Sequence, residues 1–362
     1  MRIMILANND VGLYKFRKEL LEALVVNNEV YINLPSGEYI DKLVSIGCNF
    51  IPCDLLDRHG TNPIKELKLI SYYKALLKKY KLDIVFTYTI KCNAYGGMAC
   101  GSLGIPYVAN ITGLGTAVEN GGVMQKITLT LYKAGLKKAQ KVFFQNTENR
   151  DFMLKHHVVT GAYDLLPGSG VNLSQYMVTE YPDGDPINFL FIARLMKEKG
   201  IEQYLDAAEA IHKNHPNTLF HICGASEPEY DMTRLNKLIE AGIVNYHGLV
   251  SDIAGMHRIS SCTIHPTYYP EGLSNVLLES CACGRPIITT NRPGCREVVD
   301  NGVNGYVVEE KNSQDLIEKI EMFLGKSVEE RKQMGLAGRE KVEKEFNRQI
   351  VINKYLRELD KV

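Results

Sequence analysis

The sequence has no net charge and no long hydrophobic segment. Its 362 residues include 42 Lys and Arg against 42 Asp and Glu. No stretch approaches the roughly 18 apolar residues that a membrane-spanning helix needs. The opening residues, MRIMILANND, hold too short an apolar run for a secretory signal and are better interpreted as a first β-strand. These features argue against a membrane-spanning or secreted protein.

Cysteine is present, but not in a pattern that binds zinc or forms a disulfide framework. The nine cysteines are scattered, and the close pair Cys281 and Cys283 has no further Cys or His at zinc-finger spacing. We therefore expect reduced, mostly buried thiols and a cytoplasmic location. Internal repeats and low-complexity tracts are also absent, and the length predicts about two ordinary globular domains.

Short apolar runs alternate with amphipathic segments along the chain. The runs lie at residues 3–7, 30–33, 84–87, 107–110, 142–145, 189–193, 219–223, 263–266, 286–289 and 305–308. Helical patterns fill the intervals, as at 15–26 and 64–79. Strict alternation of strand and helix predicts parallel sheets that are covered by helices on both faces.

A polar segment rich in Gly and Pro, residues 166–187, separates two series of such runs. We therefore predict an α/β protein with two doubly wound, Rossmann-like domains, residues 1–165 and 188–345, facing across a cleft. A C-terminal helix, 346–362, is expected to pack back on the first domain. Ligands of such sheets bind beyond the carboxyl ends of the strands, so function should lie in the strand-to-helix loops.

The most informative loop is HPTYYPEGLSNVLLE, residues 265–279. A strand ends at its start and a helix begins near Ser274, which can cap that helix. Backbone N–H groups in the first turn of a helix form an anion site, which suits a diphosphate. Glu271 stands just before this turn, where it can bond sugar hydroxyls, and Glu279 lies two turns on, within reach of a ribose. A capped helix with two solvated glutamates is the alternative interpretation.

Two cations follow the strand predicted at 189–193. Arg194 leaves the end of that strand, and Lys199 comes five residues later at the start of a helix. Both can reach a pyrophosphate, where they would stabilise the charge that develops as a sugar–phosphate bond breaks. Surface salt bridges are the alternative interpretation of each residue alone.

Together these motifs resemble the large retaining glycosyltransferase family four, whose members have the GT-B fold. The segment CGRPIITTNRPGCREVVDNGVNGYVV looks like the glycine loop of that family, and GSGVN looks like its domain junction. The resemblance covers nearly the whole chain and is strongest over residues 165–310. The positions that carry it are Arg194, Lys199, Gly224, Glu271, Glu279, Gly294, Glu297 and Gly305.

The resemblance implies a UDP-sugar donor and retention at the anomeric carbon. By analogy Glu271 would bond the donor sugar and Glu279 the ribose, with Arg194 and Lys199 on the diphosphate and residues 247–252 against the base. The donor site would further include Gly12, Gly224, Val250, Gly272, Leu273, Ser274 and Asn275. We expect no metal and no other cofactor, because the DxD-like Asp183-Gly184-Asp185 lies in the linker without a strand leading into it.

The first half departs from the family. Gly12 is the one glycine in the loop NNDVGLYKFR, and Thr112 stands where many relatives carry a histidine, so we nominate no general base. The segments TYTIKCNAYGG and NITGLG resemble the subgroup that extends polyprenyl-diphosphate-linked glycans for surface polysaccharides or glycoconjugates. The acceptor side would then include Arg17, Lys91, Asn93, Thr112 and Gly113.

Charge is divided unevenly between the halves. Residues 1–165 carry a net charge of +6 and residues 166–362 a net charge of −6, which indicates an anionic partner for the first half. Basic amphipathic segments can lie on an anionic membrane surface, although a solvated helix face is the alternative. One such segment is 65–81, and a second places on one helical face Val123, Lys126, Ile127, Leu131, Lys133, Lys137 and Lys141.

We therefore expect a cytoplasmic glycosyltransferase that transfers a hexose or N-acetylhexosamine to a lipid-linked glycan. Its membrane contact would be peripheral, on the inner face, and no nucleic-acid partner is expected. A sugar-nucleotide 2-epimerase of similar fold, a transferase with a soluble acceptor and a non-catalytic nucleotide-sugar binder are the alternatives. An epimerase would convert a UDP-sugar by itself, whereas a transferase needs an acceptor.

Overall fold

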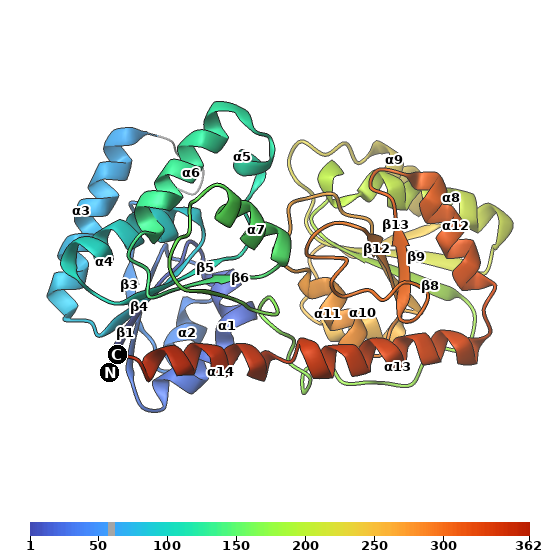
Figure 1. Ribbon diagram of the computed structural model, residues 1–362. Coiled ribbons are helices and arrows are strands. Elements are labelled where there is room, and N and C mark those ends of the chain that lie inside the picture. The colour runs from blue at the N-terminus through green and yellow to red at the C-terminus, as the bar shows by residue number, and fades with distance from the viewer. Residues whose placement is uncertain (57–61) are drawn as a thin grey trace. The chain divides into compact units, whose positions relative to one another are not determined.

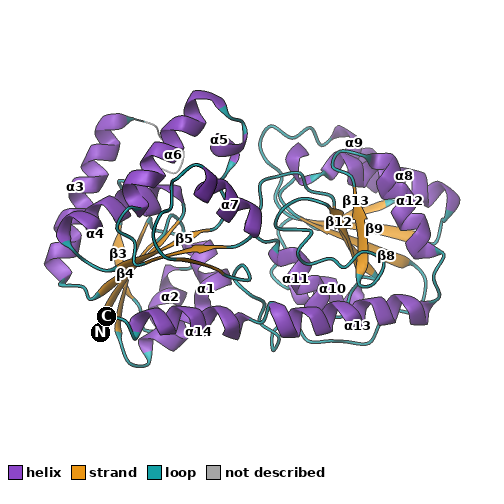
Figure 2. Cartoon of the chain, in the orientation of Figure 1, coloured by secondary structure: helices purple, strands orange, loops and turns teal. Residues whose placement is uncertain are grey.

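The structure, a computed structural model, describes residues 1–56 and 62–362, which form two units (Figure 1). Unit 1 comprises Met1–Gly170 and Arg348–Val362, and unit 2 comprises Val171–Asn347. Each unit has a parallel sheet with helices on both faces (Figure 2). The predicted fold class of two doubly wound, Rossmann-like domains is confirmed.

Unit 1 has a seven-stranded sheet in the order β3-β2-β1-β4-β5-β6-β7. Its strands are β1 (Arg2–Leu6), β2 (Glu29–Leu34), β3 (Asn49–Pro52), β4 (Ile84–Tyr88), β5 (Tyr107–Ile111), β6 (Lys141–Phe144) and β7 (Tyr163–Leu165). Its helices are α1 (Asp10–Val25), α2 (Ile40–Ser45), α3 (Pro63–Tyr80), α4 (Gly97–Leu103), α5 (Thr116–Glu119), α6 (Gly122–Leu136), α7 (Thr147–Lys155) and α14 (Arg348–Leu359).

Unit 2 has a six-stranded sheet in the order β10-β9-β8-β11-β12-β13. Its strands are β8 (Ile187–Ile192), β9 (Thr218–Cys223), β10 (Val244–Tyr246), β11 (Cys262–His265), β12 (Ile287–Thr290) and β13 (Gly305–Val308). Its helices are α8 (Ile201–Asn214), α9 (Thr233–Glu240), α10 (Ile253–Ile259), α11 (Asn275–Ala282), α12 (Ser313–Leu324) and α13 (Val328–Glu345).

The strand order of each sheet reverses at one pair of neighbours, β1 and β4 in unit 1 and β8 and β11 in unit 2. The loops that follow two such strands run to opposite faces of the sheet and leave a crevice at its carboxyl edge. In unit 2 these are the loops after β8 and β11, the two that the sequence singled out.

All ten predicted strands are present, and the strands that sequence reasoning missed are β3, β7 and β10. Each of the three lies at the edge of a sheet. Their residues are largely exposed or half-buried, whereas every residue of the central strands β4 and β5 is buried. Edge strands have one unpaired side and need no continuous apolar run, so their sequences carry little signal.

The segment predicted as a linker belongs to unit 2 from Val171 onward. Arg285, before β12, holds part of it in place, because its fully buried guanidinium donates hydrogen bonds to six carbonyl oxygens and one hydroxyl. Three of these bonds go to Thr179 and Glu180 of the segment, at 2.8–3.2 Å. Burial lowers the pKa of Arg285.

The C-terminal helix α14 lies in unit 1, below the sheet in Figure 1. Val351, Ile352 and Tyr355 pack into the core beneath β1, β4 and β6. The Tyr355 hydroxyl also accepts a hydrogen bond of 2.7 Å from the side chain of Asn110 on β5. The chain therefore passes between the units twice, after residue 170 and after residue 347.

Replacing Arg285 with Met should destabilise unit 2. The change removes the donors of buried carbonyl groups and leaves their desolvation uncompensated, so we expect the free energy of unfolding to fall by roughly 3–5 kcal/mol. Urea denaturation measures this loss. Arg258→Met is the control, because the Arg258 side chain is exposed, and it should change stability by less than about 0.5 kcal/mol. Equal urea midpoints for the two variants would contradict the assignment.

Candidate active site

A lysine–glutamate pair lies at the carboxyl edge of the unit 2 sheet. Lys199 follows β8 and Glu271 follows β11, its neighbour in the sheet. The Lys199 ammonium bonds Glu271 Oε1, and the two side chains are 13% and 18% exposed. Burial alone would raise the pKa of the Glu271 carboxyl, but the Lys199 ammonium outweighs it, and the pKa is lowered to about 2. The carboxylate is therefore ionised at neutral pH.

A close backbone contact next to Lys199 fixes the position of this residue. Gly200, which ends the 3₁₀ turn bearing Lys199, has a φ of +79°, and a Cβ there would lie 2.1 Å from the carbonyl oxygen of Pro266. The turn is held further by a 2.9 Å hydrogen bond from the Tyr268 N–H to the Glu198 carbonyl. A side chain at position 200 would force the loops after β8 and β11 apart.

The glycine loop of the sequence closes over the start of α11. A Cβ on Gly294, whose φ is +87°, would lie 2.8 Å from the Gly272 carbonyl oxygen and 2.9 Å from Glu271 Cβ. The Gly294 carbonyl accepts a 2.7 Å hydrogen bond from the Ser274 N–H, and its own N–H donates to Glu297 Oε2 at 2.7 Å. Gly294 thus fixes the backbone beside Glu271.

This closure corrects two details of the predicted anion site. Ser274 is the N-cap residue of α11, but its side chain makes no capping hydrogen bond. Its N–H is also not free, since it donates to the Gly294 carbonyl. Leu273 packs its side chain into the core together with Leu277, so only its backbone can face a ligand.

Arg194 follows the end of β8 and is engaged by a different carboxylate from the one that Lys199 bonds. It forms an ion pair with Glu227, and its side chain is about half exposed. Nearby, the Gly224 N–H donates a 2.7 Å hydrogen bond to the Gly248 carbonyl, which joins the loops after β9 and β10. Val250 lies in that second loop and is partly exposed.

Glu279 lies on α11 with its side chain mostly buried. Its Oε2 is 4.0 Å from Nε2 of His257, a fully buried histidine of α10. Burial lowers the pKa of His257 to about 3, so this imidazole is neutral. Glu279 on α11 and Glu271 in the loop before it therefore each lie beside a buried histidine.

Two predicted acceptor-side residues of unit 1 are engaged within that unit. Arg17 on α1 is almost fully buried, and its guanidinium carbon lies 5.3 Å from the centre of the Tyr88 ring at the end of β4. Lys91 follows β4 and forms a 2.5 Å ion pair with Glu66 of α3. The charge of Lys91 is thus already offset by a carboxylate.

Asn93 has a structural role in this fold. It is fully buried in the π-helical turn Cys92–Gly96, where its Oδ1 accepts a 2.6 Å hydrogen bond from the Thr87 hydroxyl. Its Nδ2 donates to the Asn110 carbonyl at 2.9 Å. The side chain joins the carboxyl ends of β4 and β5 and does not face solvent.

The remaining predicted residues of unit 1 lie at the carboxyl edge of its sheet. Thr112 and Gly113 directly follow β5 and are partly exposed. Gly12 lies in the first turn of α1, where its N–H donates a 2.6 Å hydrogen bond to the Asn9 side chain. These three stay candidates for ligand contact.

Three residues beside the predicted site were missed from the sequence. Glu227 pairs with Arg194, and the Tyr269 ring lies 4.4 Å from the Lys199 ammonium. His265, the last residue of β11, lies against Glu271. The one sequence signal for any of the three was the position of His265 at the end of a predicted strand. The contacts of Glu227 with Arg194 and of Tyr269 with Lys199 each join separate loops, so the sequence does not show them.

Within residues 1–56 and 62–362, no group of three or more His, Cys, Asp and Glu side chains is placed to hold a metal ion. Asp185 of the DxD-like triplet accepts a 2.8 Å hydrogen bond from the Asn217 side chain. Asp185 therefore takes part in a hydrogen bond within unit 2, just before β8.

Comparisons with known proteins show what the two units are similar to. Residues 2–146 match the family model described as glycosyl transferase 4-like, and residues 177–341 match the one described as glycosyl transferases group 1. The solved structure of HepE from Anabaena in complex with UDP-glucose superposes with a TM-score of 0.81 over 100% of both chains, at 15% identity.

Two curated relatives are similar over most of their length. An N,N'-diacetylbacillosaminyl-diphospho-undecaprenol alpha-1,3-N-acetylgalactosaminyltransferase from Campylobacter jejuni is 28% identical over 100% of this chain and 99% of its own. A UDP-Gal:alpha-D-GlcNAc-diphosphoundecaprenol alpha-1,3-galactosyltransferase from Escherichia coli is 27% identical over 79% of this chain and 78% of its own.

The fold and these matches define the chain as a glycosyltransferase with the GT-B fold. It belongs to glycosyltransferase family four, with a 4-like first domain and a group 1 second domain, as its motifs predicted.

The stability of unit 2 should fall in mild acid because of His221 on β9. Its Nδ1 lies 2.9 Å from His247 Nε2, and burial, with His247 beside it, lowers the pKa of His221 to about 4. Since the unfolded pKa is about 6.5, stability is complete above pH 6.5. It falls by up to ~3 kcal/mol as the pH drops from 6.5 to 4, because the unfolded chain binds the proton first.

Urea unfolding at pH 7, 5 and 4 measures this loss. His221→Gln removes one titrating group and should reduce the loss between pH 6.5 and 4 by up to ~3 kcal/mol, leaving the part that His257 contributes through its own lowered pKa. His156→Gln, at an exposed position of unit 1, is the control. An unchanged slope in His221→Gln would show that the acid sensitivity arises elsewhere.

Proposed function

We propose that this glycosyltransferase transfers a sugar from a UDP-sugar to a glycan carried on a polyprenyl diphosphate, with retention at the anomeric carbon. Its role would be in the biosynthesis of surface polysaccharide or glycoconjugate. The observation that carries the proposal is the mostly buried Lys199–Glu271 pair beside the start of α11. The donor and acceptor classes are supported by the names of the Campylobacter and Escherichia relatives and by the UDP-glucose in the HepE structure.

The two ion pairs of the site suggest how the donor binds. The diphosphate would take Lys199 from Glu271 and Arg194 from Glu227, because it carries more negative charge than either carboxylate. Both cations would then stabilise the charge on the departing UDP. Glu271 would bond hydroxyls of the transferred sugar, and Glu279 would bond the ribose.

The site needs no metal in this proposal. Lys199, Arg194 and the first turn of α11 together supply the positive charge that a divalent cation supplies in other transferases. Turnover is therefore expected to continue in excess EDTA. Loss of activity on chelation, with recovery on addition of Mg²⁺ or Mn²⁺, would refute this part of the proposal.

Glu271→Gln should lower turnover by roughly 10²-fold, because it removes a preorganised charge at the reacting sugar. We would measure UDP release in EDTA from UDP-Gal, UDP-GalNAc, UDP-GlcNAc and UDP-glucose, each with GlcNAc-diphosphoundecaprenol as acceptor. Donor affinity should change far less. Glu240→Gln, an exposed residue of α9, is the control and should match the wild type. Wild-type turnover in Glu271→Gln would remove Glu271 from the site.

The same assay separates the alternatives that the sequence left open. Matches to named transferases favour a transferase over a sugar-nucleotide 2-epimerase or a non-catalytic binder. An epimerase would convert the UDP-sugar in the absence of the acceptor. Efficient transfer to a water-soluble glycan would favour a soluble acceptor over a lipid-linked one.

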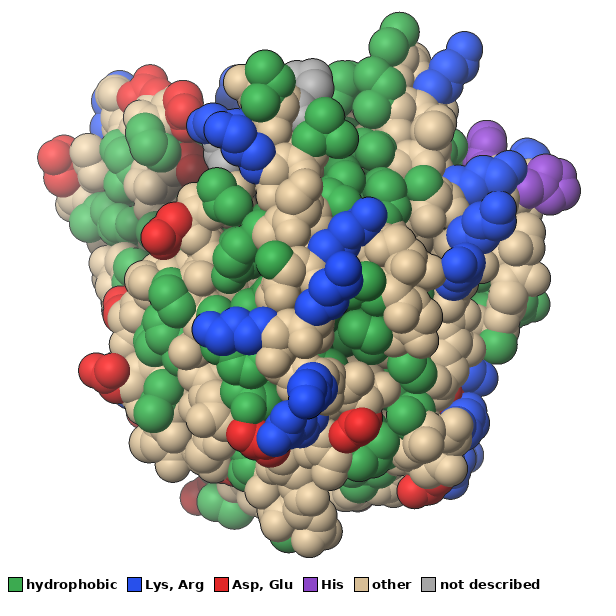
Figure 3. Space-filling view, turned by 90° about the vertical axis from the view of Figure 1, so that its left-hand side faces the viewer, with side chains coloured by type: hydrophobic (Ala, Val, Ile, Leu, Met, Phe, Trp, Pro, Cys, Tyr) green, Lys and Arg blue, Asp and Glu red, His purple; other side chains and the backbone are tan. Residues whose placement is uncertain are grey.

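Membrane contact of unit 1 is a second part of the proposal. In the described residues, no helix is long and apolar enough to cross a membrane. On α6, Val123 and Ile127 are 72% and 47% exposed. Lys126, which lies between them in the sequence, and Lys133, which follows them, are exposed as well. Figure 3 views unit 1 from the side of α3 and α4 and shows Lys and Arg side chains interspersed with hydrophobic ones. Such a surface suits peripheral binding to anionic lipid on the cytoplasmic side.

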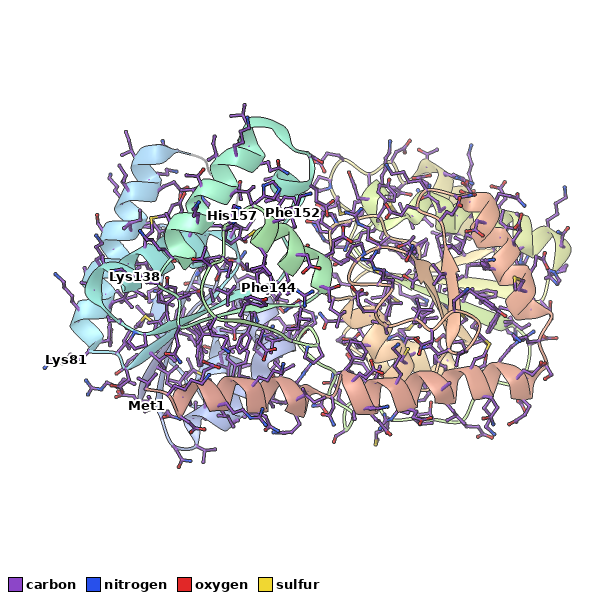
Figure 4. All side chains as sticks on the ribbon, in the orientation of Figure 1. Met1, Lys81, Lys138, Phe144, Phe152 and His157 are labelled. Carbon is purple, nitrogen blue, oxygen red and sulfur yellow. The ribbon has the colours of Figure 1, made fainter. Side chains whose placement is uncertain are left out.

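The structure corrects part of the predicted basic face. Helix α6 ends at Leu136, so Lys141 lies on β6, where its ammonium is 3.8 Å from a Glu358 carboxylate oxygen of α14. Leu131 packs against the core. Lys138 follows α6, and its ammonium donates a 2.9 Å hydrogen bond to the Gly101 carbonyl of α4 (Figure 4). Lys126, Lys133 and Lys137 remain exposed.

Replacing Lys126, Lys133 and Lys137 with Glu should abolish binding to anionic vesicles. Each Lys near such a surface contributes about 1 kcal/mol, so their loss should weaken binding by at least roughly 10²-fold. Co-sedimentation with phosphatidylglycerol vesicles measures it, and wild-type binding should also weaken at high salt.

The matched control replaces the exposed Lys213, Lys237 and Lys332 of unit 2, which gives the same change in net charge. This control should keep wild-type binding. If both triple variants lost binding equally, net charge and not the α6 surface would account for the effect.

A further inference from the structure

His265 is buried without a hydrogen-bond partner beside the proposed catalytic carboxylate. Its side chain is 3% exposed, and among the described residues neither ring nitrogen has a hydrogen-bond partner. Its Nε2 lies 3.9 Å from Glu271 Oε1, which is the oxygen that Lys199 also bonds. The distance exceeds a hydrogen bond by about 1 Å.

This burial costs stability, because a buried imidazole that makes no hydrogen bond has lost its water without replacement. Other polar groups of the same strand end are satisfied: the backbone carbonyl of His265 accepts a 2.8 Å bond from the Thr289 hydroxyl, and the Thr267 carbonyl accepts a 2.6 Å bond from the Thr290 hydroxyl. An apolar side chain at position 265 would fit the interior better. The unsatisfied ring therefore indicates a function that the free protein does not display.

We propose that His265 is a positioning residue that takes over Glu271 when the donor diphosphate draws Lys199 away. The neutral imidazole would then donate its Nε2–H to Glu271 Oε1, after a shift of about 1 Å. This inference rests on the proposed function, in which Glu271 contacts the transferred sugar. It involves no proton transfer and no covalent step.

The need for such a partner follows from the surroundings of Glu271. A mostly buried carboxylate that loses its cation is stabilised when another donor takes the place of that cation. Burial lowers the pKa of His265, although Glu271 opposes this, so the ring is neutral and carries one N–H. A neutral donor holds the carboxylate in place without competing with Lys199 in the free protein. Catalytic hydrogen bonds of this kind often shorten only when the substrate is bound.

The test compares His265→Gln with His265→Leu in the UDP-release assay described above. The glutamine amide nitrogen reaches about the same point as the imidazole Nε2, whereas leucine has no donor. We expect kcat within about fivefold of the wild type for His265→Gln and a loss of roughly 10- to 100-fold for His265→Leu. The KM for the donor should change less than about threefold in both. His265→Met serves as a second apolar variant.

Thermal unfolding distinguishes this role from packing. A purely structural His265 would be replaced better by Leu than by Gln, in stability and in turnover alike. We expect the two properties to rank the variants in opposite orders. His265→Leu should be at least as stable as His265→Gln, whereas His265→Gln should turn over faster than His265→Leu. Equal turnover in the two variants, or faster turnover in His265→Leu, would overturn the inference.

A double-mutant cycle with Glu271→Gln completes the test. If His265 acts through Glu271, His265→Leu should cause little further loss of turnover in the Glu271→Gln background. An undiminished further loss would overturn the positioning role while leaving the proposed function intact. Wild-type turnover of Glu271→Gln alone would instead overturn the role of Glu271, and the inference about His265 with it.

Discussion

The site depends on the contact between the backbone of Gly200 and the carbonyl of Pro266. The loops after β8 and β11 meet there so closely that a Cβ at position 200 would lie 2.1 Å from the carbonyl oxygen. Because these strands are neighbours at the reversal of the sheet, their loops form the walls of the crevice at its carboxyl edge. The contact places the Lys199 ammonium against the Glu271 carboxylate.

Once paired, the two charges are hard to separate. Removing one partner of a buried ion pair leaves an uncompensated charge, so a ligand that takes Lys199 must bring negative charge of its own. A diphosphate meets that requirement, and a neutral sugar does not. The same logic applies more weakly to Arg194, because its pair with Glu227 is half exposed and solvent screens it. In the free protein both cations are thus paired with carboxylates.

Unit 1 is organised differently around its carboxyl edge. Its polar residues there are largely used inside the unit: Asn93 joins two strand ends, and Lys91 is paired with Glu66. Its free charge lies instead on the outer helices, where Lys side chains stand beside exposed apolar residues of α6. Such a division of roles is consistent with a donor that is held in unit 2 and an acceptor that is presented at a membrane surface.

The arrangement of strands could be predicted from the sequence because central strands of a parallel sheet are buried on both faces. That burial requires continuous apolar runs, and all ten predicted runs are strands. The edge strands β3, β7 and β10 escaped detection because most of their residues are exposed or half-buried. Lys141 was placed on the wrong element because spacing continues past a helix end without any change in the pattern.

The sequence by itself determined the fold class, the family and the loops of the candidate site, since these depend on local periodicity and on motifs within a few residues. Only the tertiary structure decided which charges meet. Lys199 and Glu271 are 72 residues apart, and Arg194 and Glu227 are 33 apart. Their pairing follows from strand order and from backbone contacts at Gly200 and Gly294. His265 became a candidate in the same way, because a missing hydrogen bond is a property of three-dimensional surroundings and leaves no mark on the sequence.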